Sequence, residues 1–356
     1  MNTKITQILE LAVANNASDI HLSASSSPRI RVNGVLNELP SVDMGSPQVA
    51  TDTILSTLSQ QQLERFKAEK ELDYSLSVGG HRLRVNMFLK NGEVSCAMRI
   101  VPLAIPDFGT MNLPRVLSDL AEYKQGLILV AGPTGHGKST TVAATLNKIN
   151  QERSCHILTI EDPIEYVITP VKSIISQREL GSDTDSFTMA LKSALRQDPN
   201  VVFVGEMRDL ETVALALTVA ETGHLVFSTL HTNSASQTID RIIDVFPEGS
   251  KDQIRVQLAS VLTAVISQRL VPAVNGGRVP AFEILVATSA VKNAIREGKS
   301  FMIDNVIQTS SDLGMVSLEQ SLANLVKQGV VAEDVAMSYA LRPVELQNSL
   351  RSKRMI

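Results

Sequence analysis

An apolar run followed at once by a glycine-rich turn dominates this sequence. Residues 127–141 read LILVAGPTGHGKSTT, which is the pattern of a buried strand, then G-x-x-x-x-G-K-S, then a stretch compatible with a helix. Glycines at these positions let a backbone wrap closely around anionic oxygens, and the helix start that follows favours negative charge. The pattern therefore predicts an α/β fold in which one strand ends in a phosphate-binding loop.

Each part of this loop has a predicted task. Lys138 is expected to reach the β- and γ-phosphates, and Ser139 to ligate Mg²⁺ that arrives with the nucleotide. His136 is expected to be a tolerated side chain at a variable position, without a catalytic role. ATP and Mg²⁺ are the predicted cofactors, and the predicted binding segment comprises Gly132, Pro133, Thr134, Gly135, His136, Gly137, Lys138, Ser139 and Thr140.

Length and composition exclude several other classes. A chain of 356 residues allows about two domains, and a formal net charge of −4 argues against a nucleic-acid partner. Cys96 and Cys155 form no C-x-x-C pair, which argues against a zinc site and indicates a reduced, cytoplasmic protein. No apolar run approaches the length of a membrane span, so direct membrane insertion is not expected and membrane contact would need a partner.

The pattern of apolar residues changes along the chain. Residues 1–100 alternate as in a small α+β domain, with helical patterns at 3–15 and 46–69 and strand patterns at 19–23, 29–32, 72–78, 82–89 and 93–100. Prolines cluster in residues 101–113, which predicts a linker. Residues 114–288 hold four short apolar runs typical of a parallel sheet (LILVA, CHILTI, VVFVG and HLVFST), and residues 289–356 are predicted to be helical.

Two acidic clusters follow apolar strands beyond the loop. ILTIEDPIEYV offers Glu161, Asp162 and Glu165, and VVFVGEMRD offers Glu206. Carboxylates at strand ends are often solvated turn residues, but two such clusters after a phosphate loop favour a catalytic role. Glu206 is the predicted general base, and Glu161 is expected to support water or metal. Asp162 precedes Pro163 and is expected to contribute to a turn as well.

Two histidines stand at the ends of one apolar strand. His224 and His231, in ETGHLVFSTLHTN, are separated by seven residues, which points them to opposite faces of an ideal strand. His231 is expected near the γ-phosphate as a sensing residue, whereas His224 is a candidate with an equally good structural explanation.

Taken in order, four motifs resemble the secretion ATPase superfamily of type II secretion and type IV pili. They are GPTGHGKST, TIEDPIEY, VVFVGEMRD and TGHLVFSTLHTN, and the resemblance is strongest to the type IV pilus retraction ATPases. SDIHLS and RVNG near the start, and AVKNAIREGK and LGMVSLEQSLANLVKQG near the end, extend it over nearly the whole chain.

This resemblance implies a PAS-like N-terminal domain, a RecA-like ATPase domain and a ring of six subunits. It also implies ATP-driven retraction of the pilus at an inner-membrane platform protein, with the chain peripheral to the cytoplasmic membrane. Arginines that complete the nucleotide site in the family would match Arg82, Arg84 or Arg99 here, and strand arginines exposed to solvent are the simpler explanation for at least one of them.

Three alternatives stay open. One is a pilus-assembly or type II secretion ATPase of the same superfamily, although such members usually carry a four-cysteine zinc element that this chain lacks. Another is a DNA-dependent RecA-like translocase, which the acidic balance opposes. The third is a ring component that binds nucleotide without turnover. His136 and Lys292 depart from the residues usual in the family, and the basic tail that ends at Ile356 has no assigned role.

Overall fold

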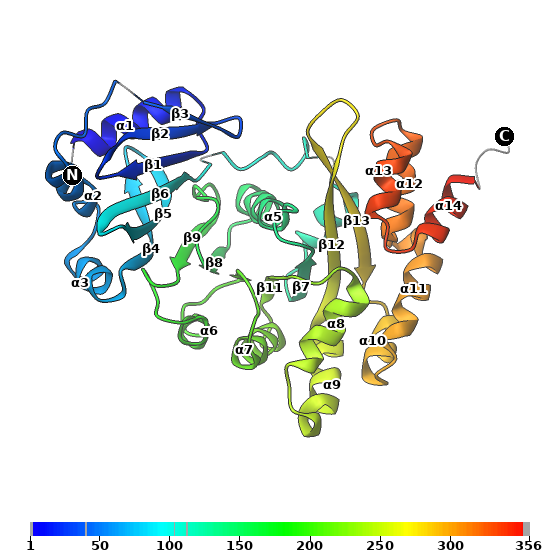
Figure 1. Cartoon of the computed structure of the whole chain (residues 1–356). Coiled ribbons are helices and arrows are strands. Elements are labelled where there is room, and N and C mark those ends of the chain that lie inside the picture. Colours follow the sequence, from blue (N-terminus) through cyan, green and yellow to red (C-terminus); the bar gives the residue numbers. More distant parts are fainter. Residues whose placement is uncertain (1–2, 40, 103, 112, 352–356) are drawn as a thin grey trace. The chain divides into compact units, whose positions relative to one another are not determined.

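The computed structural model describes residues 3–39, 41–102, 104–111 and 113–351. The chain separates into two compact units, coloured along the sequence in Figure 1. The N-terminal unit comprises residues 1–104 with 165–167, and the second unit comprises residues 105–164 with 168–356. The main boundary falls inside the stretch 101–113 that the prolines predicted to be a linker. The predicted C-terminal helical region belongs to the second unit.

The N-terminal unit is an antiparallel sheet with helices packed on it. The strand order is β3-β2-β1-β6-β5-β4. Along β5, the alternate residues Leu83, Val85 and Met87 are fully buried, as expected for a sheet with one covered face. The elements of this unit are α1 (Thr3–Ala14), β1 (Asp19–Ser23), β2 (Ser26–Val32), β3 (Val35–Glu38), α2 (Pro47–Leu55), α3 (Gln60–Glu69), β4 (Glu71–Val78), β5 (His81–Lys90) and β6 (Glu93–Ile100).

Two details of this unit differ from the sequence predictions. The single helical stretch predicted at 46–69 is two helices, because Ser59 starts α3 with a capping box to Gln62. The turn at Asn33 and Gly34 implied a following strand, but the bounds of β3 could not be predicted, since all four of its residues are exposed and show no alternation of apolar and polar side chains. The other predicted strands of this unit are present within a few residues of their expected bounds.

The second unit is built on a seven-stranded sheet in the order β13-β12-β7-β11-β10-β8-β9. Neighbouring strands run parallel except for β13, which pairs antiparallel with β12. The four predicted strands lie in the middle of this sheet. The strands are β7 (Gly126–Ala131), β8 (His156–Glu161), β9 (Ile174–Glu179), β10 (Val201–Val204), β11 (Leu225–Leu230), β12 (Leu262–Pro272) and β13 (Arg278–Val286).

Helices cover both faces of this sheet, which is why its strands read as continuous apolar runs. Along β7, Leu127 and Leu129 pack on the face that α6 to α10 cover, and Ile128 and Val130 pack on the face of α4 and α5. The helices are α4 (Arg115–Leu120), α5 (Lys138–Glu152), α6 (Phe187–Ala194), α7 (Leu210–Glu221), α8 (Ala235–Asp244), α9 (Lys251–Val261), α10 (Ser289–Arg296), α11 (Ile303–Thr309), α12 (Leu318–Lys327), α13 (Glu333–Tyr339) and α14 (Pro343–Arg351). The predicted α/β fold class is confirmed. Among the described helices, none has the length and apolar character that crossing a membrane requires.

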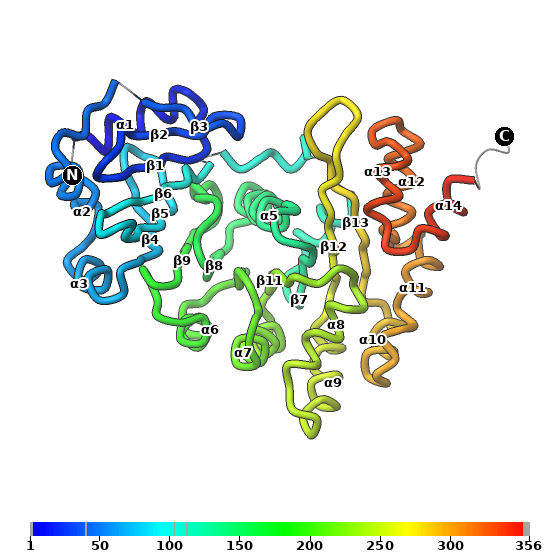
Figure 2. The backbone as a smooth tube through the Cα atoms, in the orientation of Figure 1, coloured from blue at the N-terminus to red at the C-terminus, as the bar shows by residue number. Residues whose placement is uncertain are grey.

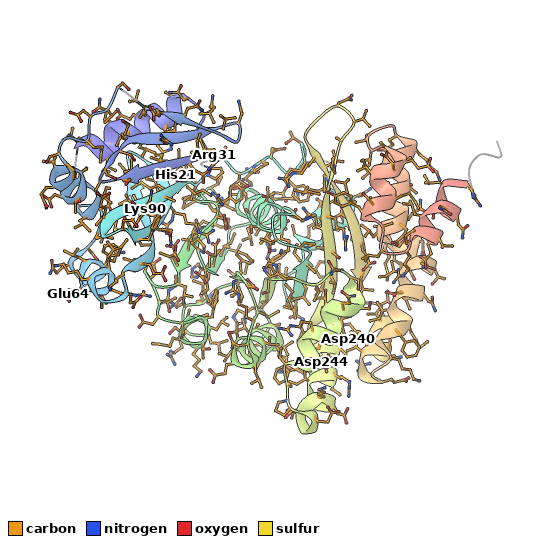
Figure 3. The ribbon with its side chains drawn as sticks, viewed as in Figure 1. His21, Arg31, Glu64, Lys90, Asp240 and Asp244 are labelled. Carbon is orange, nitrogen blue, oxygen red and sulfur yellow. The ribbon has the colours of Figure 1, made fainter. Side chains whose placement is uncertain are left out.

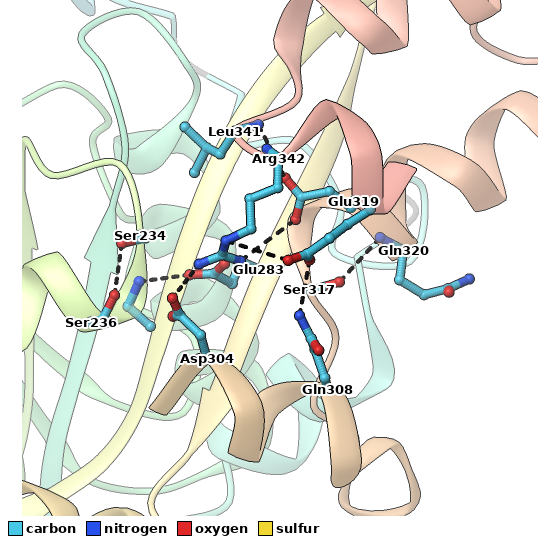
Figure 4. Close-up of polar contacts among 12 residues, drawn as sticks. Ser234, Ser236, Glu283, Asp304, Gln308, Ser317, Glu319, Gln320, Leu341 and Arg342 are labelled. Carbon is cyan, nitrogen blue, oxygen red and sulfur yellow. Dashed lines mark hydrogen bonds and ion pairs between the residues drawn. The ribbon is translucent and has the colours of Figure 1, made fainter. Parts of the chain in front are cut away.

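A group of charges around Arg342, which includes the buried carboxylates Glu283 and Glu319, lies between the C-terminal helices and the edge strand β13 (Figure 4). Arg342, just before α14, donates to Asp304 of α11 and lies 3.9 Å from Oε2 of Glu319. Glu319 also accepts hydrogen bonds from the backbone nitrogens of Leu341 and Arg342 at 3.1 and 2.9 Å. Glu283 of β13 accepts a 2.7 Å bond from the backbone nitrogen of Ala235, the first residue of α8.

Candidate nucleotide site

The predicted phosphate loop connects β7 to α5, and Figure 2 traces the backbone along it. Gly132, Gly135 and Gly137 adopt φ angles of 142°, 77° and 82°, which favour glycine. Gly137 is also the residue that precedes α5, and no side chain caps this helix start. The first turn of a 15-residue helix is therefore open to an anion, which fits a bound phosphate.

Lys138 folds back over the loop. Its side chain donates to the carbonyl oxygens of Gly132 at 2.7 Å and Pro133 at 3.0 Å, and the residue is 6% exposed. Burial lowers the pKa of Lys138, whereas the charge of Glu206 raises it. A buried cation whose partners are mostly neutral groups can bind an anionic ligand favourably, because a phosphate would compensate its charge.

The sheet edge brings His231 and Glu206 to the loop. Nδ1 of His231 lies 3.4 Å from the Lys138 nitrogen and 3.3 Å from the Thr134 hydroxyl. Nε2 of the same ring lies 3.3 Å from Oε2 of Glu206. These residues follow β7, β10 and β11, which are neighbours in the sheet, so their carboxyl ends meet at one edge.

Glu206 is also paired with Arg208 at 2.8 Å. Burial acts to raise the pKa of Glu206, but hydrogen bonds and charge from Arg208 and His231 outweigh it and leave the pKa below its usual value. A carboxylate held ionised in this way can accept a hydrogen bond from water and orient it. Arg208 was not singled out from the sequence, although it stands two residues after Glu206 in the quoted motif.

Glu161 ends β8, and its carboxylate accepts from Thr159 at 2.6 Å and from Gln177 at 3.1 Å. The residue is 7% exposed. A β-carbon added to Gly205, the residue before Glu206, would lie 3.2 Å from the Glu161 α-carbon, so the two acidic strand ends are adjacent. Asp162 contributes charge that raises the pKa of Arg208. The structure thus places Glu161, Asp162 and Glu206 at the predicted edge.

Two predicted residues lie elsewhere. His224 precedes β11 at the amino end, opposite the edge that carries His231, and its ring lies 3.0 Å from both the Thr222 hydroxyl and the Val219 carbonyl. Glu165 falls in the segment that groups with the N-terminal unit, where Oε1 is 3.4 Å from Nη1 of Arg84.

The predicted arginines belong to one face of the N-terminal sheet. Arg84 of β5 lies opposite Arg99 of β6 in the sheet register. Arg99 lies opposite Asp19 of β1, and Asp19 lies opposite Arg31 of β2. These four side chains therefore form one row across the sheet. Arg31 is labelled in Figure 3. Arg82, two residues before Arg84 on β5, lies on the same face. We call Arg31, Asp19, Arg99 and Arg84 the arginine row.

Asp19 is the acidic member of the arginine row. Its carboxylate lies 2.9 Å from Nε of Arg99 and 3.8 Å from Nε of Arg31. Burial acts to raise the pKa of Asp19, but Ser18 and Arg99 together leave it lowered. Asp19 and Arg31 were not predicted from the sequence; the alternation of β1 and β2 was visible, but the pairing of β1 with both β2 and β6 was not.

A glycine-lined loop, a buried lysine and a carboxylate–histidine pair at one edge of a parallel sheet define a P-loop nucleotide-binding protein. Residues 1–331 match the family described as Type II/IV secretion system protein, and the chain belongs to this family.

Two curated relatives are similar over most of their length. The "Type IV pilus retractation ATPase PilT" of Pseudomonas aeruginosa is 44% identical over 340 residues, which cover 95% of this chain and 98% of the relative. The "Twitching motility protein" of Neisseria gonorrhoeae is also 44% identical, over 93% of this chain and 89% of that protein.

A solved structure has the same architecture. The crystal structure of the pilus retraction motor PilT with bound ADP superposes with a TM-score of 0.90 at 45% identity, over 98% of this chain and all of that one. The predicted membership of the secretion ATPase superfamily is confirmed, and so are the predicted ATPase class and nucleotide binding at the level of the family.

Proposed function

We propose that this chain is an ATP-hydrolysing motor subunit that retracts type IV pili. The observation that carries the proposal is the joint placement of Lys138, His231 and Glu206 at the phosphate loop, in a chain that matches a retraction ATPase over 95% of its residues. The loop glycines adopt the positive φ angles that let the backbone curve around an anion, and the uncapped start of α5 offers backbone N–H groups to a triphosphate.

The residues divide the work of hydrolysis. Lys138 exchanges the carbonyl oxygens of Gly132 and Pro133 for phosphate oxygens and neutralises their charge. Glu206 orients the attacking water and accepts its proton when Arg208 releases the carboxylate. His231, which spans Lys138 and Glu206, senses whether the terminal phosphate is present.

Magnesium would be held by Ser139 and the triphosphate, with Glu161 in its outer shell, and it would supply charge neutralisation at the phosphates. Both residues fit this role, since Ser139 is in the open first turn of α5 and Glu161 is a buried carboxylate at the same sheet edge.

We further propose that six copies form a ring that is peripheral to the cytoplasmic membrane and acts on an inner-membrane platform protein. A neighbouring subunit supplies the cation that stabilises charge developing on the terminal phosphate, and Arg82, Arg84 and Arg99 are the candidates. Light scattering with and without ATP tests the ring, and the ATPase rate of each arginine-to-alanine variant tests the candidates.

Two variants test the hydrolytic mechanism. Lys138→Ala is expected to lose ADP and ATP binding, whereas Glu206→Gln is expected to bind ATP and release phosphate at least about a hundredfold more slowly. Nucleotide retention and phosphate release are measured on the same preparations. Phosphate release by Glu206→Gln at the wild-type rate would refute the role of Glu206.

A deletion strain separates retraction from the alternatives. Loss of a retraction motor leaves cells with excess pili and without twitching, whereas loss of an assembly motor leaves them bald. An ATPase rate that rises with added DNA and falls steeply with salt would instead indicate a DNA translocase.

A further inference from the structure

The side chain of His136 is tied to a neighbouring strand of the sheet. Nδ1 of His136 accepts a 3.0 Å hydrogen bond from the backbone nitrogen of Leu270 on β12. A backbone N–H can only donate, so Nδ1 must carry its lone pair. The imidazole in this arrangement is neutral, with its proton on Nε2.

The same strand holds the loop by a second side chain. Gln268 is 2% exposed, and its amide donates to the His136 carbonyl at 2.9 Å. Its oxygen accepts from the Thr141 hydroxyl in α5 at 2.6 Å. Together, Gln268 and Leu270 connect β12 to the loop at His136 and to the first turn of α5 at Thr141.

The loop lies so close to β12 that only glycine fits at two positions. A β-carbon on Gly132 would lie 2.3 Å from the Gln268 carbonyl oxygen, and one on Gly137 would lie 2.8 Å from the Gln268 amide nitrogen. The loop is thus packed against β12 at both ends, and the His136 ring makes the contact between them.

The charges that face His136 are all positive. They come from Arg269 on β12, Arg278 on β13 and Lys138 on α5, and Arg278 also donates to the Gly135 carbonyl at 3.2 Å. Burial first, and then these cations, hold the pKa of His136 below its ordinary value of 6.5. The neutral ring is therefore the form that prevails near neutral pH.

We infer that His136 is a positioning residue that fixes the phosphate loop on β12 through its neutral imidazole, and that its protonation weakens nucleotide binding. A proton on Nδ1 would face the Leu270 N–H, so this hydrogen bond is lost and the loop is held only by the bonds from Gln268 and Arg278 to its carbonyl oxygens. This inference rests on the proposed nucleotide site and goes beyond the tolerated position that the sequence suggested.

The test measures ADP affinity from pH 8 to pH 5.5 in the full-length wild type, His136→Asn and His136→Ala. The amide oxygen of asparagine can replace Nδ1 as an acceptor but does not titrate. At pH 8 we expect His136→Ala to bind ADP roughly three- to tenfold more weakly than wild type, and asparagine to recover most of that loss. Between pH 8 and pH 5.5, we expect the wild-type affinity to fall roughly three- to tenfold relative to His136→Asn.

His224→Asn is the matched control, because His224 lies at the opposite edge of the same sheet. It should keep the pH dependence of wild type. Dividing each affinity by that of His136→Asn at the same pH removes the titration of ADP itself. A wild-type affinity that runs parallel to that of His136→Asn, or equal affinities of His136→Ala and wild type at pH 8, would overturn the inference. Absence of ADP binding by wild type would instead defeat the proposed function.

Discussion

Glu283 provides a quantitative test of the buried charges in the second unit. The residue is 1% exposed, and Arg342, whose charge acts on it, also pairs with the carboxylates of Asp304, Glu319 and Glu345. Burial raises the pKa of Glu283 from 4.5 to about 7; the charges of Asp304 and Glu319 add to this rise, and Ala235 and Arg342 oppose it. The carboxyl is thus more readily protonated in the folded chain than in the unfolded chain.

The sign of the pH dependence follows from this rise in pKa. A raised folded-state pKa stabilises the fold fully below about pH 4.5, and the contribution is lost as pH rises to about 7. Each pKa unit is worth about 1.4 kcal/mol, so Glu283 removes about 3 kcal/mol of stability between these limits. Glu283→Gln keeps an acceptor for the Ala235 N–H but does not titrate. The free energy of unfolding of this variant should therefore lack this decrease with rising pH.

Urea unfolding of wild type and Glu283→Gln at pH 5 and pH 8 measures the effect. The chain has no tryptophan, so far-ultraviolet circular dichroism is the suitable signal. The urea slope is expected to be about 2–3 kcal/mol per molar. When the pH is raised from 5 to 8, the unfolding midpoint of wild type should therefore fall by about 1 M relative to that of Glu283→Gln. Glu333→Gln, at an exposed position in α13, is the control. Midpoints of wild type and Glu283→Gln that shift equally with pH would refute the reasoning.

Two further substitutions test the packing of the second unit. Gly132→Ala places a β-carbon 2.3 Å from the Gln268 carbonyl oxygen at a φ of 142°, so ADP affinity should fall at least about tenfold; unchanged affinity in a titration would contradict the close packing. Asn150 is fully buried and bonds the backbone of residues 169, 171 and 173, so Asn150→Ala should cost about 2–3 kcal/mol in urea unfolding; a change below about 0.5 kcal/mol would show that these bonds are replaceable.

Much of the nucleotide site was predictable because its parts are local in sequence. The loop and the first turn of α5 are one continuous segment, and the acidic residues and His231 directly follow apolar strands. Parallel strands carry their ends to one edge, so the strand pattern alone indicated that Glu206 and His231 would meet near the loop. The contact of His231 with both Lys138 and Glu206 required the strand order, which the sequence does not give.

The contacts that join distant segments were not predictable. Strands β12 and β13 escaped notice because α9 runs directly into β12 without a break, although Asn275, Gly276 and Gly277 mark the turn between the two strands. The support of the loop by Gln268 and Leu270 therefore stayed hidden, and His136 was interpreted as a tolerated residue. The charged group around Arg342 could not be predicted for the same reason, since Glu283, Asp304 and Glu319 come from three separate elements and Arg342 from the segment before α14.

The turn between β12 and β13 offers a position for a reporter group. Asn275 is exposed in this turn, and Arg278, three residues on, donates to the Gly135 carbonyl of the phosphate loop at 3.2 Å. Burial raises the pKa of the Cys96 thiol to about 12, so this cysteine resists labelling. In a variant with Cys155→Ser, the emission of a fluorophore attached to a cysteine at position 275 would report nucleotide exchange at the loop in real time.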